Sequence, residues 1–369
     1  MDVKLVKYRL SELLSLGDAR RDSDAFVQYG DPKKLAVFAA NPFRRGEDSA
    51  TRVVLMVDGA VAGGEYVYPL EIVADGKIVK CGSGSETSIK EEYRKSAVGL
   101  EFLSGEGPLE ESTHVSLGCG MAQRYARIHK MFGYKIFPMP RFMAVFHSHS
   151  VVEMYAPRVL VKTLSAILDC GLLLWWKLVA LYGTWCLRHY EIREVKPDET
   201  GVLARIAELT MSDGMRFKEN HCVEWFRWHL TQALHEEGPS RLYAMTKAGV
   251  VVGFFMTKRR FHAQASSRGF KNVMLGSVIE WGVESELQKM LVPAVLAAVL
   301  QLRREKVDAV EVATSDTALI GGLRRSLMRP VGESNFGIRV GGRSVLAEVP
   351  GWDDPANWRL RPAMCDNGL

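Results

Sequence analysis

Cysteine is scarce in this sequence, and its spacing excludes the common cysteine-based sites. The chain of 369 residues contains six cysteines, none of them in a Cys-x-x-Cys pair. Neither a zinc site nor a dithiol redox motif is therefore indicated. Wide spacing of this kind favours reduced thiols and hence a cytoplasmic protein. The first residues also lack the apolar core of a signal peptide, which agrees with that expectation.

A strong charge of either sign is also missing. The net charge is +5, with 25% charged and 47% apolar residues, which are ordinary values for a soluble globular protein. A small positive excess suits an anionic ligand, but it is too small to indicate binding to nucleic acid. The length predicts two or three domains, each large enough to bury its own core.

Long apolar runs are rare, and the clearest one spans residues 167–187. It contains three of the eight tryptophans of the chain, and its length approaches that of a membrane-spanning helix. Asp169 and Lys177 argue against a span, because each would be costly in the hydrocarbon core. Three interpretations stay open: a helix packed between domains, an interface with a partner or a second copy, and peripheral contact with a membrane.

Turn signals divide the first part of the chain into short elements. Asp58-Gly59 and Asp75-Gly76 are typical of tight hairpin turns. Strands are expected at 52–57, 60–72, 77–89, 113–117, 135–137 and 142–147, with helices ending near 103 and covering 121–131. His147 and His149 then share one face of the last strand. A three-strand meander followed by alternating helices and strands predicts an α/β fold, with a mixed sheet covered by helices.

The second half repeats this order. Gly249-Val250-Val251-Val252-Gly253 has the same position between two strands as Gly59-Ala60-Val61-Ala62-Gly63. Further strands are expected at 272–283 and 308–313, and helices at 199–210, 220–235, 287–304 and 317–327; the first half has shorter helices within 32–40. Two copies of one fold explain the length better than one large domain. The expected boundaries are 1–155 for the first copy, 156–189 for an apolar linker helix, 190–350 for the second copy, and 351–369 for an irregular tail.

The junction after the third strand carries the most specific pattern. It reads Arg94-x-x-Ala97-x-Gly99 at the start of a helix, where small residues let backbone N–H groups approach a phosphate. This pattern resembles the pyrophosphate-binding signature of the GCN5-related N-acyltransferases, Gln/Arg-x-x-Gly-x-Gly/Ala, with Ala97 in place of the first glycine. The order of elements is also similar to that family's fold.

The resemblance implies acetyl-coenzyme A or another acyl-coenzyme A as co-substrate. It assigns the pyrophosphate to the turn and the pantetheine arm to the backbone of the third strand. The cofactor-binding residues expected on this basis are Gly82, Ser83, Gly84, Arg94, Lys95, Ser96, Ala97, Val98 and Gly99.

The second copy departs from the signature. Gln288 stands opposite Arg94, Leu291 opposite Ala97, and Pro293 opposite Gly99. Proline has no backbone N–H, and leucine fills the space that a small residue leaves open. The first copy is therefore expected to bind the co-substrate, and the second is expected to be degenerate.

Acyl transfer to an amine needs a base for the amine proton and an acid for the leaving thiolate. In the family a tyrosine before a Gly-Phe pair often supplies the acid. Here His129 occupies that position, before Gly133-Tyr134, and Tyr125 lies one helical turn earlier on the same face. The family draws its base from the second or third strand, where Glu65 and Glu86 are the candidates. No metal site is expected.

These features predict an N-acyltransferase that moves an acetyl or other short acyl group to an amine. The acceptor would be a small molecule, a sugar or a peptide, which attacks the thioester directly. The alternative is a non-catalytic binding or interaction module that has lost acyl transfer. A third interpretation is an acyltransferase at a membrane surface, with residues 167–187 as a peripheral anchor or, instead, as a homodimer contact.

Overall fold

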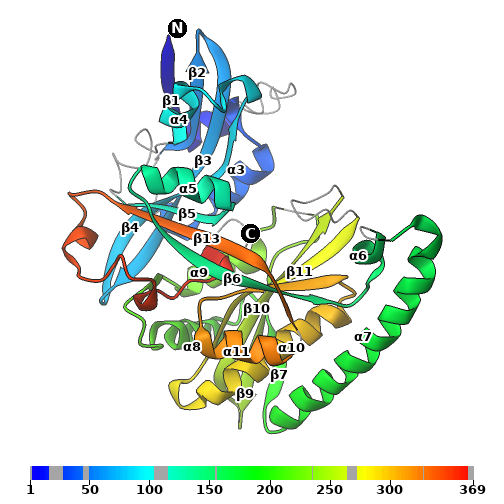
Figure 1. Cartoon of the computed structure of the whole chain (residues 1–369). Coiled ribbons are helices and arrows are strands. Elements are labelled where there is room, and N and C mark those ends of the chain that lie inside the picture. The colour runs from blue at the N-terminus through cyan, green and yellow to red at the C-terminus, as the bar shows by residue number, and fades with distance from the viewer. Residues whose placement is uncertain are drawn as a thin grey trace.

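One mixed sheet runs through both halves of the molecule (Figure 1). The computed structural model describes residues 2–15, 28–44, 50–103, 115–153, 156–234, 236–263, 272–326 and 328–364. Within these residues the strands follow the order β1-β2-β3-β4-β5-β13-β6-β12-β11-β10-β9-β7, and β8 pairs with β3. Helices cover the sheet, which confirms the predicted α/β fold.

The first half begins as an antiparallel meander of β1 (Val3–Arg9), β2 (Ala50–Val57), β3 (Ala60–Ala74) and β4 (Lys77–Ile89). Asp58-Gly59 and Asp75-Gly76 both have positive φ angles, as two-residue hairpin turns require, so both predicted turns are confirmed. β1 was not predicted. It lies at the edge of the sheet and pairs with β2 alone.

Helices pack on both faces of this meander. One face carries α1 (Leu10–Ser15) and α3 (Pro32–Ala39), whose Leu13 and Phe38 are fully buried against Tyr66 and Tyr68 of β3. The other face carries α4 (Ala97–Leu103) and α5 (Gln123–Met131), and there Val98 packs with residues of β2. β5 (Val115–Met121) lies between α4 and α5 in the chain.

The second half contains the counterparts of these elements. β9 (Arg241–Lys247), β10 (Val250–His262) and β11 (Val273–Val283) form the second meander, followed by α10 (Leu291–Arg304), β12 (Ala309–Ala313), α11 (Thr317–Arg325) and β13 (Arg329–Val340). β7 (Glu191–Val195), α8 (Thr200–Met211), β8 (Phe217–Glu219) and α9 (Val223–Thr231) precede them. The repeated order of elements is therefore confirmed.

The two halves exchange their last strands. β13, from the end of the chain, lies between β5 and β6 (Lys135–Val145), with Ile338 opposite Leu117. β6 lies between β13 and β12, with Phe142 opposite Val312. Each half therefore completes the sheet of the other, and the central four strands belong to both.

β6 also corrects a prediction. Residues 135–137 and 142–147 were expected as two strands, but Lys135–Val145 is continuous. Pro138 and Pro140 stand where β6 pairs with β13 alone, because β12 pairs only from Arg141 onward. A strand tolerates proline at such an edge. His147 lies beyond the strand and His149 begins α6 (His149–Glu153), so the two histidines do not share a strand face.

The tryptophan-rich segment forms α7 (Arg158–Cys186), at the outer edge of the second half (Figure 1). It is not packed between the halves, which corrects that interpretation. Trp176 and Val179 join the core around α10, but only 17% of the most apolar part of the helix is buried. The length and composition of α7, and of Ser285–Arg304, would suffice to cross a membrane.

The C-terminal residues form three short 3-10 turns, at Val345–Glu348, Pro355–Asn357 and Pro362–Met364. Trp358 is buried and stacks on Phe217 at 5.0 Å between ring centroids. Arg359 N donates to Phe217 O at 2.9 Å, and Tyr68 Oη donates to Met364 O at 3.4 Å. The segment thus joins strands of both halves.

Candidate active site

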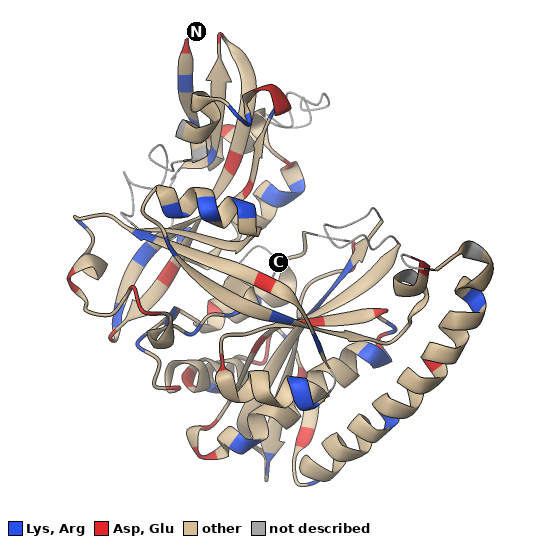
Figure 2. Cartoon of the chain, viewed as in Figure 1, with Lys and Arg blue, Asp and Glu red and all other residues tan. Residues whose placement is uncertain are grey.

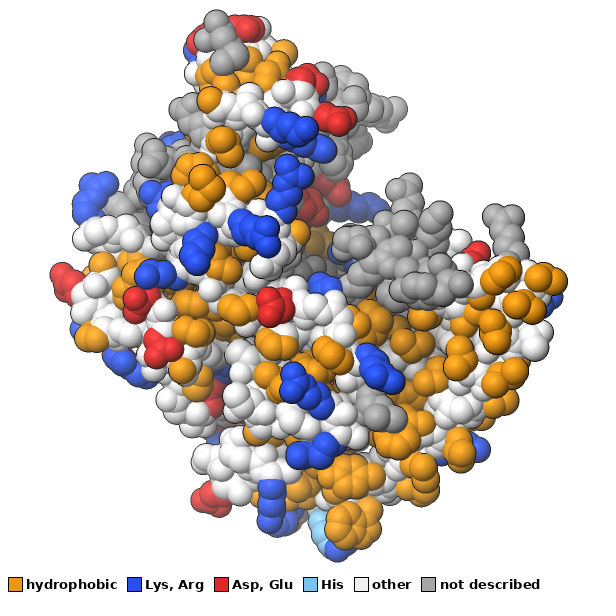
Figure 3. Space-filling view, in the orientation of Figure 1, with side chains coloured by type: hydrophobic (Ala, Val, Ile, Leu, Met, Phe, Trp, Pro, Cys, Tyr) orange, Lys and Arg blue, Asp and Glu red, His pale blue; other side chains and the backbone are white. Residues whose placement is uncertain are grey.

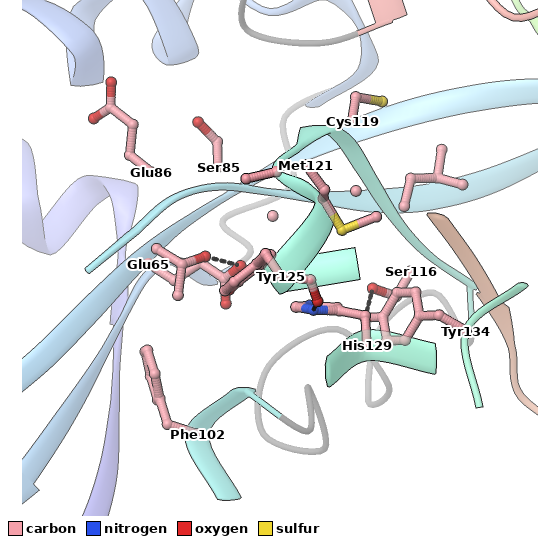
Figure 4. Close-up of a pocket in the computed structure, with 15 residues that line it drawn as sticks. Glu65, Ser85, Glu86, Phe102, Ser116, Cys119, Met121, Tyr125, His129 and Tyr134 are labelled. Atoms are coloured by element: carbon pink, nitrogen blue, oxygen red, sulfur yellow. Dashed lines mark hydrogen bonds between the residues drawn. The ribbon is translucent and has the colours of Figure 1, made fainter. Parts of the chain in front are cut away.

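The site lies where two parallel strands separate. β4 and β5 pair at only three positions: Gly82 lies opposite Ser116, Ser83 opposite Leu117, and Gly84 opposite Gly118. β4 then continues to Ile89 and β5 to Met121 without pairing to each other. A cavity of about 260 Å³ opens beyond Gly84, between β3, β4, β5 and α5 (Figure 4). Backbone groups at a parallel edge of β4 are therefore available to a ligand.

A β-bulge shapes this end of β4. Gly64 pairs with Ser88 and Tyr66 with Ser85, so Glu65 alone faces the two residues Glu86 and Thr87. Glu86 has a φ of 50°, in the left-handed region that an L-residue rarely adopts. As a result, Thr87 Oγ1 donates to Glu65 Oε1 at 2.9 Å. The extra residue thus brings a hydroxyl to the carboxylate.

Glu65 is the carboxylate inside the cavity. A Cβ atom at position 84 would collide with Glu65 Oε1, so Gly84 provides the space that the carboxylate occupies. Desolvation raises the pKa of Glu65 to about 7, although the Thr87 hydrogen bond and the positive charge of Arg52 oppose this rise. A carboxylate with a pKa near neutrality is suited to accept a proton and release it again.

Tyr125 projects from α5 towards Glu65 (Figure 4). Burial raises the pKa of its phenol, and the nearby Glu65 charge raises it further, while a hydrogen bond with Thr87 opposes both. The phenol therefore stays protonated at neutral pH and can donate a proton. The base and acid candidates meet at one hydroxyl, that of Thr87.

His129 lies deeper on the same helix. Its Nδ1 lies 3.2 Å from Tyr125 O, which can only accept a hydrogen bond, so the proton is on Nδ1. The centre of its ring lies 4.3 Å from the ring centre of Tyr125 and 4.8 Å from that of Tyr134. Burial lowers the pKa of His129, so the ring is neutral. This environment suits a residue that positions Tyr125.

Glu86 points away from this group (Figure 4). Its side chain is 55% exposed, and Glu86 Oε1 lies 2.8 Å from Lys34 Nζ. Lys34 is itself buried, with Nζ 4.9 Å from the centre of the Tyr66 ring. Glu86 thus compensates a buried cation, and Glu65 is the better placed of the two predicted bases.

The predicted pyrophosphate turn follows β4 directly. Arg94 Nε donates to Ile89 O at 2.8 Å, which fixes the guanidinium against the end of the strand. A Cβ atom at position 99 would collide with Tyr93 O, so Gly99 allows the close approach of the helix to the turn. Ser96 Oγ accepts from Gly99 N at 3.2 Å.

Several backbone donors of this turn are open. Within the described part of the chain, the N–H groups of Lys95, Ala97 and Val98 have no hydrogen-bond acceptor. The turn therefore fits an anionic group. Gly82 and Ser83 lie further back, where β4 pairs with both β3 and β5.

The structure thus brings Glu65, Glu86, Tyr125, His129 and Gly84 to one cavity. The remaining predicted residues lie along β4 or in the turn that follows it. Sequence reasoning missed Thr87, because the bulge that turns it towards Glu65 is invisible in the residue pattern. It also missed the pair of Ser116 and Tyr134, whose hydroxyl oxygens are 2.6 Å apart behind His129. Among the described residues, no group of three or more His, Cys, Asp or Glu side chains is arranged to hold a metal ion.

The second half has a corresponding opening with different contents. β11 and β12 pair in parallel only as far as Val278 and Val312, and a cavity of about 550 Å³ lies beyond them. Gly253 pairs with Val283 as Gly63 pairs with Ile89, which places Phe255 at the position of Glu65.

The acid candidate is also replaced in the second half. Counted from the start of each helix, Leu319 of α11 stands where α5 has Tyr125. The C-terminal segment enters the second cavity with Arg359 and Arg361. Arg359 Nη2 lies 2.6 Å from Glu280 Oε1, and both side chains are buried.

Known structures share this architecture. No protein-family model matches the sequence, and no curated protein matches it either. Two structures of Saccharomyces cerevisiae N-myristoyltransferase with bound myristoyl-CoA align with TM-scores of 0.55 and 0.56, at 10% and 11% identity. They cover 91% and 92% of this chain, and 82% and 79% of their own. A GCN5-related N-acetyltransferase from Anabaena variabilis aligns at 13% identity with a TM-score of 0.49, covering 92% of this chain and 73% of its own.

The chain therefore has the fold of the GCN5-related N-acyltransferases, in a tandem arrangement like that of the myristoyltransferase. The myristoyltransferase neighbours are N-acyltransferases with bound myristoyl-CoA. At such low identity the likeness establishes the fold, and the chemistry has to be argued from the site itself.

Proposed function

We propose that this protein transfers an acyl group from acyl-coenzyme A to an amine, and that the first half holds the reaction centre. One observation carries the proposal: Glu65, Thr87 and Tyr125 meet at the open end of β4 and β5. A base with a pKa of about 7 and a protonated phenol share one hydroxyl there, which is the acid–base pair that amide formation requires.

Acyl-coenzyme A, when bound, supplies a thioester whose carbonyl carbon an amine can attack. The N–H groups of Lys95, Ala97 and Val98 would hold its pyrophosphate, since the turn offers open donors and Gly99 lets the helix approach the turn closely. Backbone N–H groups of β4 beyond Gly84 lie at an edge that β5 leaves unpaired and would polarise the carbonyl.

The protein side chains then handle two protons. Glu65 accepts one from the amine nitrogen as the new C–N bond forms, and Tyr125 Oη donates one to the sulfur as the C–S bond breaks. The Thr87 hydroxyl contacts both groups, so a proton can pass from Glu65 back to the Tyr125 oxyanion and restore both residues. His129, neutral and packed on Tyr125, holds the phenol in place.

The donor we propose is acetyl- or another short acyl-coenzyme A. The cavity of about 260 Å³ is below the range of roughly 300–1,000 Å³ typical of pockets that enclose a drug-sized ligand, which favours a short acyl group. The acceptor class is a primary amine on a small molecule, a sugar or a peptide.

The test is transfer itself. Purified protein is incubated with acetyl-, butyryl- or myristoyl-coenzyme A and a panel of amines, and the released thiol is measured. We expect turnover with a short donor. Glu65→Gln should lower kcat by about 10²–10⁴-fold, the contribution typical of a general base, with acyl-coenzyme A binding retained in calorimetry.

Glu86→Gln is the matched control, because it makes the same change at the other predicted base and outside the Glu65–Tyr125 group. It should change kcat by less than about threefold. Binding of acyl-coenzyme A without transfer to any amine would favour the alternative, a non-catalytic module. An equal fall in kcat for Glu65→Gln and Glu86→Gln would show that Glu65 is not the general base.

A further inference from the structure

The outer face of α7 carries more than half of the exposed large apolar side chains in the described part of the chain. Nineteen large apolar side chains are exposed among the described residues, and eleven of them lie on this one helix. Seven lie on one face, spaced three or four residues apart except for a step of seven across Gly171, and are 39–67% exposed: Leu160, Leu164, Ile167, Leu174, Leu178, Leu181 and Trp185. Figure 3 shows them as an apolar surface along the edge of the molecule. A patch of this kind marks an interaction surface.

The opposite face of α7 is fixed to the protein. Trp176 Nε1 donates to Val145 O at 3.0 Å, and Trp175 Nε1 donates to Ser326 O at 3.3 Å. Ser148 N donates to Asp169 Oδ1 at 2.7 Å. These contacts attach the middle of the helix to the end of β6, to the residues just after it and to the end of α11. The helix cannot cross a bilayer while they persist, so any membrane contact has to be parallel to the membrane plane.

The apolar face is broader than a coiled-coil seam. Val159, 82% exposed, lies beside the seven-residue stripe on one side, and Leu168, 50% exposed, lies beside it on the other. A strict three-and-four stripe forms the narrow seam of a coiled coil, whereas a broad apolar arc is typical of a helix on a membrane surface. A second copy of α7 would leave the flanks of this face uncovered.

The charges around the face are of one sign. Lys177 and Arg188 are exposed, while Asp169, the one carboxylate of the helix, is held by Ser148 N on the inner side. Figure 2 shows how few charges the helix carries. Arg188 lies over the ring of Trp185 at 5.1 Å, and Arg325 of α11 acts electrostatically on Tyr182. Two copies of this face would bring cations together with no carboxylate to pair them.

We propose that α7 docks the protein on a membrane surface that contains anionic lipid. The apolar face enters the boundary between headgroups and acyl chains, and the surrounding cations contact the headgroups. The aromatic rings near the C-terminal end of the helix match the preference of tryptophan and tyrosine for that depth. The 29 residues of α7 give a contact about 43 Å long. This inference is independent of the proposed chemistry.

The test is sedimentation of the full chain with vesicles. We expect binding to vesicles of equal parts phosphatidylcholine and phosphatidylglycerol, and weaker binding to phosphatidylcholine alone. Leu174→Glu with Leu178→Glu should weaken binding at least about tenfold, since each leucine contributes apolar burial. Lys177→Glu with Arg188→Glu should weaken binding to the anionic vesicles by about fivefold or more per cation. Binding to phosphatidylcholine vesicles should not change.

Ile78→Glu is the matched control. Ile78 is 54% exposed, close to the 52% of Leu178, but it lies on β4 in the first half, and its replacement should leave vesicle binding unchanged. Circular dichroism verifies that each variant is folded. Absence of wild-type binding to the anionic vesicles overturns the proposal, as does equal binding by the Leu174/Leu178 variant. Sedimentation equilibrium tests the alternative, dimerisation through α7. If the wild type is a dimer that does not bind vesicles, and the Leu174/Leu178 variant is a monomer, α7 is an interface between copies and the proposal is wrong.

Discussion

Two pairs of parallel strands separate in the same sheet, β4 from β5 and β11 from β12, and the openings contain different side chains. The first holds Glu65 and Tyr125, and Gly84 leaves room for the Glu65 carboxylate. The second has Phe255 and Leu319 at the corresponding positions, and both are buried in the core. One backbone geometry thus carries the proposed reaction centre in one half and a packing surface in the other.

The second opening is also occupied by the chain itself. Arg359 enters it and pairs with Glu280 at 2.6 Å and with Asp213 at 3.1 Å. Arg361 stacks on Trp281 at 4.2 Å, and burial lowers its pKa to about 10. A buried ion network of this kind is costly to break, so it stabilises one arrangement of the C-terminal segment. The comparison teaches that both splayed strand pairs leave a cavity, and that the side chains lining it decide which half has an acid–base pair.

Separating the halves should have the largest effect. Residues 1–155 produced alone would lose β13 from between β5 and β6, which exposes two strand edges. We expect no cooperative thermal transition and no acyl-coenzyme A binding, measured by calorimetry. Co-expression with 156–369 should restore both. A stable, ligand-binding fragment would show that the exchanged strand is dispensable.

Replacing the acid candidate by its apolar counterpart should come next. Tyr125→Phe keeps the ring that packs on His129 and removes the proton donor. We expect kcat to fall about 10²-fold with little change in KM, since general acid catalysis contributes roughly that much. His129→Gln supplies the comparison: it should lower kcat less, because the ring only positions Tyr125. A larger fall in kcat for His129→Gln than for Tyr125→Phe would make His129 the acid and Tyr125 the positioning residue.

Closing the space between the strands should have an intermediate effect. Gly84→Ala introduces a Cβ atom where Glu65 Oε1 lies, and displacing the carboxylate should cost about tenfold in kcat. Gly118 is the cross-strand partner of Gly84, and a Cβ there meets Met121 Sδ at 3.4 Å, an ordinary contact. Gly118→Ala should therefore retain most activity. Similar losses in both variants would indicate general damage to the strands.

Removing the shared hydroxyl should move the pH profile. Glu65 acts as a base only when deprotonated, so activity should rise with pH through its pKa of about 7. The Thr87 hydrogen bond lowers that pKa. Thr87→Val should therefore shift the rising limb to higher pH, by about one unit or less. A rising limb that stays in place would show that another group titrates there.

The last effect concerns stability and not activity. The pKa of Glu65 is raised in the folded protein to about 7, against roughly 4.3 in the unfolded chain. Its contribution to stability is present below the unfolded value and is lost as pH rises through 7. Glu65→Gln cannot ionise, so it should be more stable than wild type by about 3–4 kcal/mol near pH 8, and the difference should vanish near pH 4. Chemical unfolding at the two pH values measures this.

Much of the fold could be predicted because its signals are local. Asp58-Gly59 and Asp75-Gly76 fix the hairpins through their own φ preferences, and the apolar period of each helix does not depend on distant residues. The strand exchange could not be predicted in this way. β6 and β13 are ordinary strands in sequence, and their neighbours are decided by the packing of the whole sheet.

The site was predictable in its residue types and not in its geometry. Glu65 and Glu86 are equivalent in sequence, since both are strand carboxylates. The bulge at Glu86 decides between them, by turning Thr87 towards Glu65 while Glu86 pairs with Lys34. His129 stands where the family resemblance places an acid, but its burial keeps it neutral. Such distinctions depend on desolvation, which a linear pattern does not contain.

The exchanged strand has a consequence for how the protein is made. β13 supplies Asn335, whose Nδ2 donates to Met121 O at 2.9 Å, at the edge of the first cavity. The first half leaves the ribosome early, yet its sheet is incomplete until β13 at residues 329–340 is synthesised. The nascent first half must therefore wait with β5 unpaired on one side, a state that invites association with other chains. Slow translation or a missing C-terminus should thus harm the first half most, although the lesion lies in the second.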